Sequence, residues 1–223
     1  MAIKKFTQSH TSQYEEYISI LPSNFGFSSK FLDNHNLKQK KYVEFAFDTI
    51  DIYKFYFTLS NNKTENSLFL VGHNKRAGLT VKGGEFVNSS KILISIRDDK
   101  SLTPQQRRFQ IFKDLVEDMF YFKVIPNFER RSKPSELSET NKGIYRYINQ
   151  NNEIIYIGIG GIKSRFESDE RKTWINEVKE IEYSVIDDKD EREKYENIYL
   201  KLFKNEYGTL PRYNKNSGKN YSE

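Results

Sequence analysis

Two tyrosines eleven residues apart are the side chains most suited to chemistry in this sequence. Tyr145 ends the tripeptide GIY at 143–145, and Tyr156 begins the tripeptide YIG at 156–158. Strand-forming residues flank a polar Asn/Gln turn between them, a pattern that predicts a β-hairpin. Because side chains alternate along a strand, such a hairpin can hold two phenols side by side on one face.

Hydrolysis of a phosphodiester is a reaction that such phenols could serve. It requires an activated water, stabilised charge on the phosphate oxygens and a neutralised leaving oxygen. The three histidines are His10, His35 and His73, so residues 141–223 hold none. A phenol has a pKa of about 10 and needs help from nearby cations to act as a base. Lys163 and Arg165 follow the hairpin closely and could supply it.

Four sequence blocks in order give a more specific indication. After GIY and YIG comes a short helix-like run with Arg165, then Glu196 in the run KYENIYLK at 194–201, then PRYN at 211–214. Over residues 141–218 or so, the chain resembles the GIY-YIG nuclease superfamily, and within it a member of restriction-endonuclease type. A motif match is a hypothesis that the structural context has to support.

The resemblance implies a role for each matched residue. Tyr145 would be the base or the group that positions water, and Tyr156 would bind the phosphate or the water. Arg165 would bind the scissile phosphate through its planar fork. Glu196 would hold one Mg²⁺ (or Mn²⁺), mainly through water, and Asn214 would brace the site.

The chain also departs from the family pattern. The gap from YIG to Arg165 is one residue shorter than expected, so Lys163 could share the role of Arg165. Residues 166–171 contain neither the histidine nor the tyrosine that many members carry on the arginine helix. Tyr145 would then act as the base with less support.

The function implied is a metal-dependent endonuclease that cuts double-stranded DNA, of sequence-specific restriction type, with a homodimer favoured for a double-strand break. Three alternatives stay open. One is a homing or repair-type nicking enzyme, another is an RNA-cleaving nuclease, and the third is a catalytically silent DNA-binding regulator.

Composition sets limits on the class of protein. The chain has 223 residues, 36% hydrophobic and 30% charged, with 15 Tyr and 17 Phe. It contains no cysteine, which excludes a disulfide scaffold and a thiolate zinc site. No signal peptide or apolar run long enough to span a membrane is recognisable, so we expect a cytoplasmic protein without a membrane partner.

Charge points to a polyanionic partner. The net charge is +5, and residues 141–223 hold equal numbers of basic and acidic residues, so the excess lies before them. Basic charge favours nucleic acid through phosphate contacts. By loop placement and charge, the DNA-binding candidates are Lys75, Arg76, Lys82, Arg130 and Arg131.

We therefore expect an α+β protein with a basic, β-rich DNA-recognition domain at 1–125, a linker at 126–141 and a nuclease domain at 142–223. The nuclease domain would be a β-β-α-β-α unit, a small three-stranded sheet flanked by helices. The predicted helices are 28–34, 104–121 and 188–207, and the predicted strands include 17–20, 42–48, 53–59, 67–72, 92–96 and 181–186.

Overall fold

The computed structural model describes residues 15–73 and 76–215, which form two compact units. The first unit comprises the described residues of Met1–Val87 together with Thr103–Phe122. The second comprises Asn88–Leu102 together with the described residues of Lys123–Glu223. The chain thus enters the second unit, returns to the first, and then completes the second. None of the described helices is long and apolar enough to cross a membrane.

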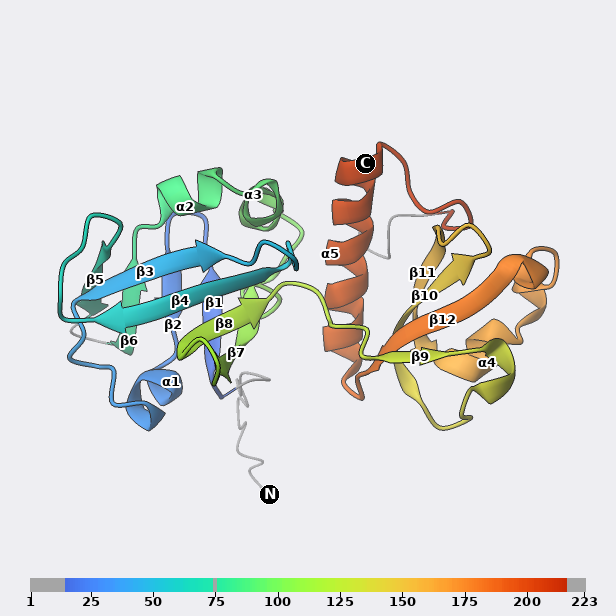
Figure 1. Cartoon of the computed structure of the whole chain (residues 1–223), viewed down its shortest axis with the longest axis horizontal. Helices are drawn as coiled ribbons and strands as arrows, with labels where there is room; N and C mark the ends of the chain where they lie inside the picture. The colour runs from blue at the N-terminus through green and yellow to red at the C-terminus, as the bar shows by residue number, and fades with distance from the viewer. Residues whose placement is uncertain (1–14, 74–75, 216–223) are drawn as a thin grey trace, which may run out of the picture. The chain divides into compact units, whose positions relative to one another are not determined.

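The first unit is a closed barrel of eight strands in the order β1-β2-β6-β5-β3-β4-β8-β7 (Figure 1). Neighbouring strands with a defined register pair antiparallel. The strands are β1 (Tyr17–Ile20), β2 (Phe25–Phe27), β3 (Tyr42–Phe47), β4 (Lys54–Ser60), β5 (Leu68–His73), β6 (Arg76–Val81), β7 (Arg108–Asp114) and β8 (Met119–Lys123).

Phenylalanine fills the barrel. Along β4 the residues alternate, so that Phe55, Phe57 and Leu59 are buried and those between them are partly exposed. Phe55 stacks on Phe122 with ring centroids 5.3 Å apart. The interior of an eight-stranded barrel is just wide enough for side chains to fill, and this core accounts for much of the phenylalanine in the sequence.

Short helices complete the barrel unit. α1 (Ser29–Asn34) begins at Ser28, whose Oγ accepts a hydrogen bond from the Phe31 backbone N–H at 3.3 Å. This side-chain cap satisfies a donor that the first turn of a helix leaves unpaired. The helix predicted at 28–34 is therefore confirmed. α2 (Gly84–Asn88) follows β6.

The second unit is built on a four-stranded antiparallel sheet in the order β11-β10-β12-β9. The strands are β9 (Arg130–Ser132), β10 (Lys142–Asn149), β11 (Ile154–Gly161) and β12 (Val178–Val185), and the helices are α3 (Lys91–Asp98), α4 (Ile162–Phe166) and α5 (Lys189–Tyr207). Single 3₁₀ turns lie at Pro134–Glu136, Asp169–Arg171 and Ile175–Glu177. The predicted hairpin is confirmed as β10 and β11.

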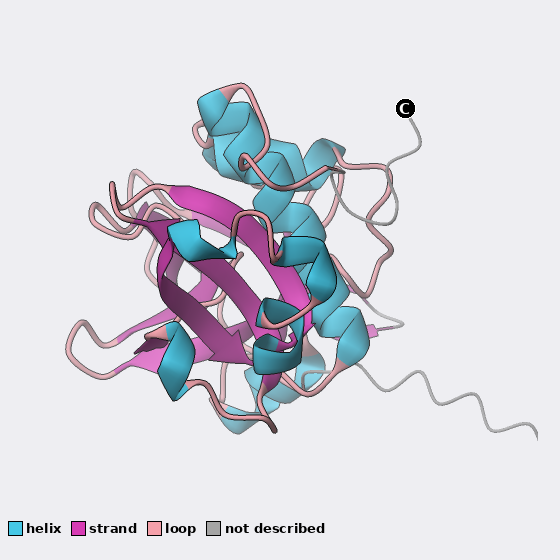
Figure 2. Cartoon of the chain, turned by 90° about the vertical axis from the view of Figure 1, so that its right-hand side faces the viewer, coloured by secondary structure: helices cyan, strands magenta, loops and turns pink. Residues whose placement is uncertain are grey.

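The two faces of this sheet are covered by different helices (Figures 1 and 2). On one face, the ring of Tyr147 contacts Phe166 of α4 at a centroid distance of 5.7 Å. On the other face, Arg146 donates a hydrogen bond to the hydroxyl of Tyr199 on α5 at 2.5 Å. Adjacent residues of a strand point to opposite faces, so α4 and α5 lie on opposite sides of β10.

α5 begins and ends where sequence signals place its ends. The Asp188 carboxylate accepts from the Glu191 backbone N–H at 2.8 Å. Gly208 adopts a left-handed φ of 76° and closes the helix by donating to the Lys204 carbonyl at 2.8 Å. Such a cap and such a glycine are the usual boundaries of a helix, and the helix predicted at 188–207 is confirmed.

The predicted fold class is wrong. The chain is mostly β, with a closed eight-stranded barrel and a four-stranded sheet, and is not an α+β protein with a three-stranded sheet flanked by helices. The fourth strand, β9, comes from within the segment expected to be a linker at 126–141. Its sequence, Arg-Arg-Ser, has no apolar alternation, because it is an edge strand that pairs only with β12.

The helix predicted at 104–121 is also wrong, because this segment forms β7 and β8. The local start signal is present: Thr103 Oγ1 accepts from the Gln106 backbone N–H at 3.3 Å, and the Gln106 side chain accepts from the Thr103 N–H at 2.9 Å. This reciprocal cap closes only one turn, and β1 then pairs with β7. Pairing with a distant strand overrides the local preference.

The strand predicted at 92–96 is α3 instead. Its isoleucines favour strands in general. Here Ser90 caps a helix by accepting from the Leu93 backbone N–H at 3.3 Å. The Asn205 side-chain amide of α5 donates to Ser95 Oγ at 2.8 Å, so α3 packs beside α5.

A candidate phosphate-binding site on the tyrosine hairpin

The hairpin places three tyrosine rings together on the α4 face of the sheet. Tyr145 and Tyr147 on β10 stack with centroids 5.1 Å apart. Tyr156 on β11 lies opposite Tyr147 in the register and 6.3 Å from the ring of Tyr145. The sequence-based expectation that both phenols of GIY and YIG share one face agrees with this geometry.

Gly158 leaves room for two of these hydroxyls. It pairs with Tyr145 across the hairpin. A Cβ added at Gly158 would lie 2.9 Å from the Tyr145 hydroxyl and 3.0 Å from the Tyr156 hydroxyl. Both hydroxyls therefore converge over the same point of the backbone, and only glycine fits beneath them.

Burial makes Tyr145 a weak acid. The side chains of Tyr145 and Tyr147 are both 0% exposed. Burial raises the pKa of Tyr145 well above its ordinary value, and the neighbouring phenols add to the rise, whereas Arg171 and Arg165 oppose it. Burial raises the pKa of Tyr147 in the same direction. At neutral pH both phenols are protonated and suited to hydrogen bonding rather than to taking up a proton.

Arg165 lies at the open end of the hairpin. It belongs to α4, and a Cβ added at Gly160 would lie 3.5 Å from its Nε. Gly160 has a left-handed φ of 115° and pairs with Gly143, so this pair contributes no side chain beside Arg165. The Arg165 side chain is exposed, and its guanidinium has no hydrogen-bond or ion-pair partner among the described residues.

Arg171 is the residue of the cluster that sequence reasoning missed. It is 5% exposed and donates to the Tyr156 hydroxyl at 2.8 Å, to Ser168 Oγ at 2.7 Å and to the Arg165 carbonyl at 2.5 Å. Its guanidinium carbon lies 4.8 Å from the Tyr156 ring centroid. A single arginine in a polar run such as 167–173 gives no sequence signal of burial.

Lys163 forms ion pairs with two carboxylates. Its ammonium lies 2.6 Å from a carboxylate oxygen of Glu139 and 3.9 Å from one of Glu167. Lys163 is therefore engaged in ion pairs at the rim of the unit, and Arg165 is the better-placed cation of α4.

Asn214 fastens the closing segment to the hairpin. Its side-chain oxygen accepts from the Ile157 backbone N–H at 2.9 Å, and its amide donates to the Ile157 carbonyl at 2.7 Å. The Tyr213 backbone N–H bonds the Ile155 carbonyl at 3.0 Å. Asn214 thus holds the edge strand that carries Tyr156, a geometry in keeping with the bracing role expected for it.

Glu196 lies on the helix that covers the opposite face of the sheet. It is three residues before Tyr199, which contacts Arg146 on that face. Among residues 15–73 and 76–215 no group of three or more His, Cys, Asp or Glu side chains is placed to hold a metal. The magnesium site expected at Glu196, with one carboxylate and water, stays a prediction.

The expected DNA-binding residues divide between the two units. Arg131 is paired with Glu180 at 3.1 Å and with Glu182 across β9 and β12, while Arg130 is exposed. Lys82 is exposed after β6. Arg76 begins β6, and Lys75 lies outside the described residues.

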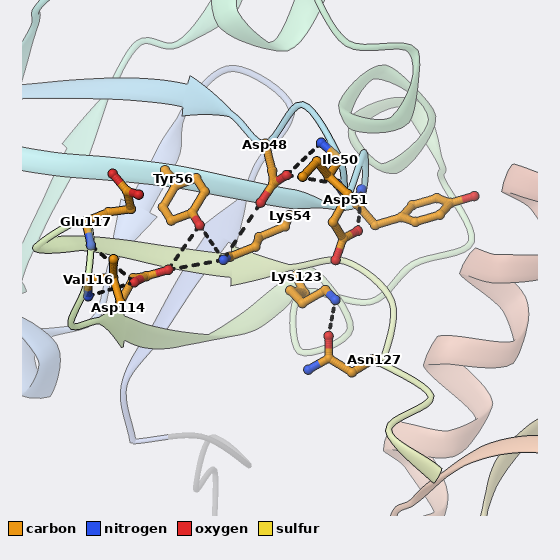
Figure 3. A network of polar contacts seen from close by, with 11 residues as sticks. Asp48, Ile50, Asp51, Lys54, Tyr56, Asp114, Val116, Glu117, Lys123 and Asn127 are labelled. Atoms are coloured by element: carbon orange, nitrogen blue, oxygen red, sulfur yellow. Dashed lines mark hydrogen bonds and ion pairs between the residues drawn. The ribbon is translucent and has the colours of Figure 1, made fainter. Parts of the chain in front are cut away.

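A second polar cluster lies on the barrel, where Lys54 contacts two aspartates (Figure 3). Its ammonium is 3.3 Å from Asp114 and 3.8 Å from Asp48, and it lies 4.3 Å from the ring centroids of Tyr56 and Tyr121. The Tyr56 hydroxyl donates to Asp114 at 3.0 Å. The charges of this cluster satisfy one another, so it joins strands rather than offering a binding site.

The tyrosine hairpin differs from that cluster in its unsatisfied groups. In the described part of the chain, five buried side-chain polar atoms lack a hydrogen-bond partner. Three of the five belong to the hairpin cluster: Tyr145 Oη, Tyr147 Oη and Arg171 Nε. Buried polar groups are normally paired, and a concentration of exceptions calls for an explanation such as a functional role.

Comparisons with protein-family models, with curated proteins and with solved structures find no match to this chain.

Proposed function

We propose that the second unit is an endonuclease that binds a DNA phosphate at the tyrosine hairpin and hydrolyses the phosphodiester. The observation that carries the proposal is the gathering of polar atoms without partners. The hydroxyls of Tyr145 and Tyr147 and the Nε of Arg171 are buried and unpaired beside the unpartnered guanidinium of Arg165. Donors and cations concentrated in this way suit a phosphate.

The geometry suggests a division of roles. Arg165, exposed at the glycine-lined end, would hold two phosphate oxygens with its planar fork. The hydroxyls of Tyr145 and Tyr156, which converge over Gly158, would donate hydrogen bonds to a phosphate oxygen or orient the attacking water. The raised pKa of Tyr145 favours this donor role over that of general base.

In the proposed reaction a water oxygen forms a bond to phosphorus, the bond from phosphorus to the 3′ oxygen breaks, and one water proton ends on the leaving oxygen. The tyrosines and arginines stabilise the charge on the phosphate oxygens. Dependence on Mg²⁺ or Mn²⁺ stays a prediction from the family resemblance, in which Glu196 alone would ligate the ion.

A catalytically silent DNA-binding protein is the second candidate. The observation that favours it is the chemistry of the cluster. Among the described residues, the hydrogen bonds of Arg171 to Tyr156, Ser168 and the Arg165 carbonyl bring in no carboxylate or imidazole that could take a proton from water. Such a protein would bind DNA through the same arginines and leave it intact.

A plasmid assay separates the two candidates. Supercoiled DNA is incubated with the full chain in Mg²⁺, Mn²⁺ or EDTA, and a structured RNA is tested in parallel. We expect the wild-type protein to give discrete DNA fragments and the Arg165→Ala variant to give none. Arg212→Ala is the control and should still cut, because Arg212 is an exposed arginine paired with Glu177 at 3.1 Å. Binding by the wild-type protein without cutting would favour the silent protein, and cutting of RNA alone would favour an RNA nuclease.

The metal and the oligomeric state are tested in the same assay. Cleavage abolished by EDTA and by Glu196→Ala would support a metal held by Glu196, despite its position on α5. Cleavage in EDTA would reject the metal requirement. A rate that rises with the square of protein concentration would support cutting by a homodimer.

A further inference from the structure

Arg171 is a buried cation whose partners are all neutral. It is 5% exposed, and its three hydrogen bonds go to a carbonyl, a serine hydroxyl and a phenol. Arginine is rarely buried without a carboxylate partner. None of the described residues supplies Arg171 with one, so in the described part of the unit its positive charge contacts only neutral groups.

The hydrogen bond between Arg171 and Tyr156 has a fixed direction. A guanidinium carries donors and no acceptor, whereas a phenol can donate one proton and accept through its oxygen. Arg171 Nη2 donates to the Tyr156 hydroxyl at 2.8 Å, so Tyr156 must be the acceptor. The proton of Tyr156 is then free to be donated elsewhere.

The place where Tyr156 can donate is the space over Gly158. The Tyr156 and Tyr145 hydroxyls lie within 3.0 Å of the same point above this glycine. The same guanidinium also binds the Arg165 carbonyl at 2.5 Å. Arg171 therefore connects the phenol of β11 with the helix that carries the exposed arginine.

We infer that Arg171 is a positioning residue that presets Tyr156 as a hydrogen-bond donor to a phosphate oxygen. It does so by occupying the acceptor side of the Tyr156 hydroxyl and by placing a positive charge behind it. The inference rests on the proposed function in one respect, because that function identifies the anion as a backbone phosphate of DNA. The direction of the hydrogen bond between Arg171 and Tyr156 does not depend on it.

A purely structural role for Arg171 makes a different prediction. Arg171 also binds Ser168 and so ties the turn after α4. If this were its whole purpose, Ser168→Ala, which removes one of the ties and leaves the bond to Tyr156, would weaken the site as Arg171→Met does. If Arg171 acts through Tyr156, only Arg171→Met should alter the change that phosphate binding causes in the NMR signal of Tyr156.

The experiment is a carbon-13 NMR titration of the full chain labelled at tyrosine Cζ, with Tyr156→Phe to assign the signal. The probe is inorganic phosphate, and a short DNA duplex in EDTA is the second arm. We expect the Tyr156 signal to shift with both probes in the wild type and in Ser168→Ala. The shift should be lost in Arg171→Met and partly kept in Arg171→Lys, which retains charge and a donor.

An unchanged phosphate response in Arg171→Met, or none in the wild type, would overturn the inference. A response to inorganic phosphate without binding or cutting of DNA would support Arg171 while rejecting the nuclease. Where cleavage is observed, Arg171→Met should lower its rate by about 10²-fold, the usual effect of losing one preorganised donor. Arg171→Lys also keeps the inference testable if Arg171→Met fails to fold.

Discussion

Two hydroxyls in the aromatic cluster do nothing for its packing. Tyr145 and Tyr147 are fully buried, and neither hydroxyl has a hydrogen-bond partner with good geometry among the described residues. Phenylalanine would fill the same space without desolvating a polar group. A buried polar atom without a partner costs about 1–3 kcal/mol, so these tyrosines are a stability cost that packing does not explain.

Replacing each tyrosine by phenylalanine separates stability from function. We expect Tyr145→Phe and Tyr147→Phe to leave the free energy of unfolding unchanged or to raise it by about 1 kcal/mol, since an unpaired hydroxyl is removed. Only Tyr145→Phe should lower DNA cleavage, by about 10²-fold, because the Tyr145 hydroxyl lies over Gly158. Urea unfolding and the plasmid assay measure the two effects. Equal losses of cleavage in both variants would contradict the assignment.

Gly158 is the other residue with a sharp geometric requirement. A Cβ here would lie 2.6 Å from Cε1 of the Tyr156 ring. We expect Gly158→Ala to destabilise the second unit by about 1–3 kcal/mol through overpacking. Gly84→Ala is the matched control, because a Cβ there meets nothing within 4 Å, and it should be neutral or slightly stabilising. Thermal unfolding of both variants measures the difference in stability. A Gly158→Ala protein as stable as the control would show that the Tyr156 ring does not approach Gly158 so closely.

At the scale of elements, the strand that carries Tyr156 is an edge. β11 is the terminal strand of its sheet, and an edge strand leaves backbone groups unpaired unless something covers them. The Asn214 amide fills that need by bonding both backbone groups of Ile157. The closing segment thus covers part of the edge of β11 through the Asn214 side chain and one backbone hydrogen bond, from Tyr213 to Ile155.

Asn214→Asp tests this arrangement with almost no change of shape. A carboxylate can accept from the Ile157 N–H but cannot donate to the Ile157 carbonyl. We expect a loss of about 1–2 kcal/mol in stability and faster hydrogen exchange at the Ile157 amide. Asn176→Asp, at an exposed position, adds the same charge and should change neither the stability nor the exchange at Ile157. Unaltered exchange at Ile157 would show that the side chain does not hold the strand.

At the scale of the whole molecule, the two units share the chain in an interleaved order. α3 follows the sixth strand of the barrel in sequence but belongs to the second unit. Just after α3, Asp99 pairs with Lys201 of α5 at 3.1 Å and accepts from Ser101 Oγ at 2.6 Å. The second unit therefore requires a segment inserted between barrel strands.

Asp99→Asn should destabilise α5 and leave the barrel strands unaffected. Burial opposes ionisation of Asp99, but hydrogen bonds from Ser101 and Lys201 prevail and hold its pKa below the ordinary value. A lowered pKa in the folded state stabilises the fold above the unfolded pKa, and this contribution disappears as pH falls below about 4. We expect a loss of about 1–2 kcal/mol at pH 6 that becomes smaller as the pH falls below about 4. Hydrogen exchange measured segment by segment shows where the stability is lost. A loss of protection in the barrel strands as well would contradict the division into units.

The sequence by itself determined the features that depend on neighbouring residues. Alternation and a polar turn identified the tyrosine hairpin, a serine cap identified α1, and an apolar stripe closed by Gly208 identified α5. Each of these signals acts within a few residues, so it survives folding unchanged. The grouping of Tyr145 and Tyr156 on one face followed from strand alternation in the same way.

Only the tertiary structure decided the features that depend on distant partners. The capping turn at Thr103 leads into strands because β1 supplies a partner for β7, and Arg130–Ser132 becomes a strand because β12 supplies one. The burial of Arg171 against Tyr156 and the position of Glu196 behind the sheet were undecidable for the same reason. Strand pairing and burial are settled by residues far along the chain, and a local pattern carries no record of them.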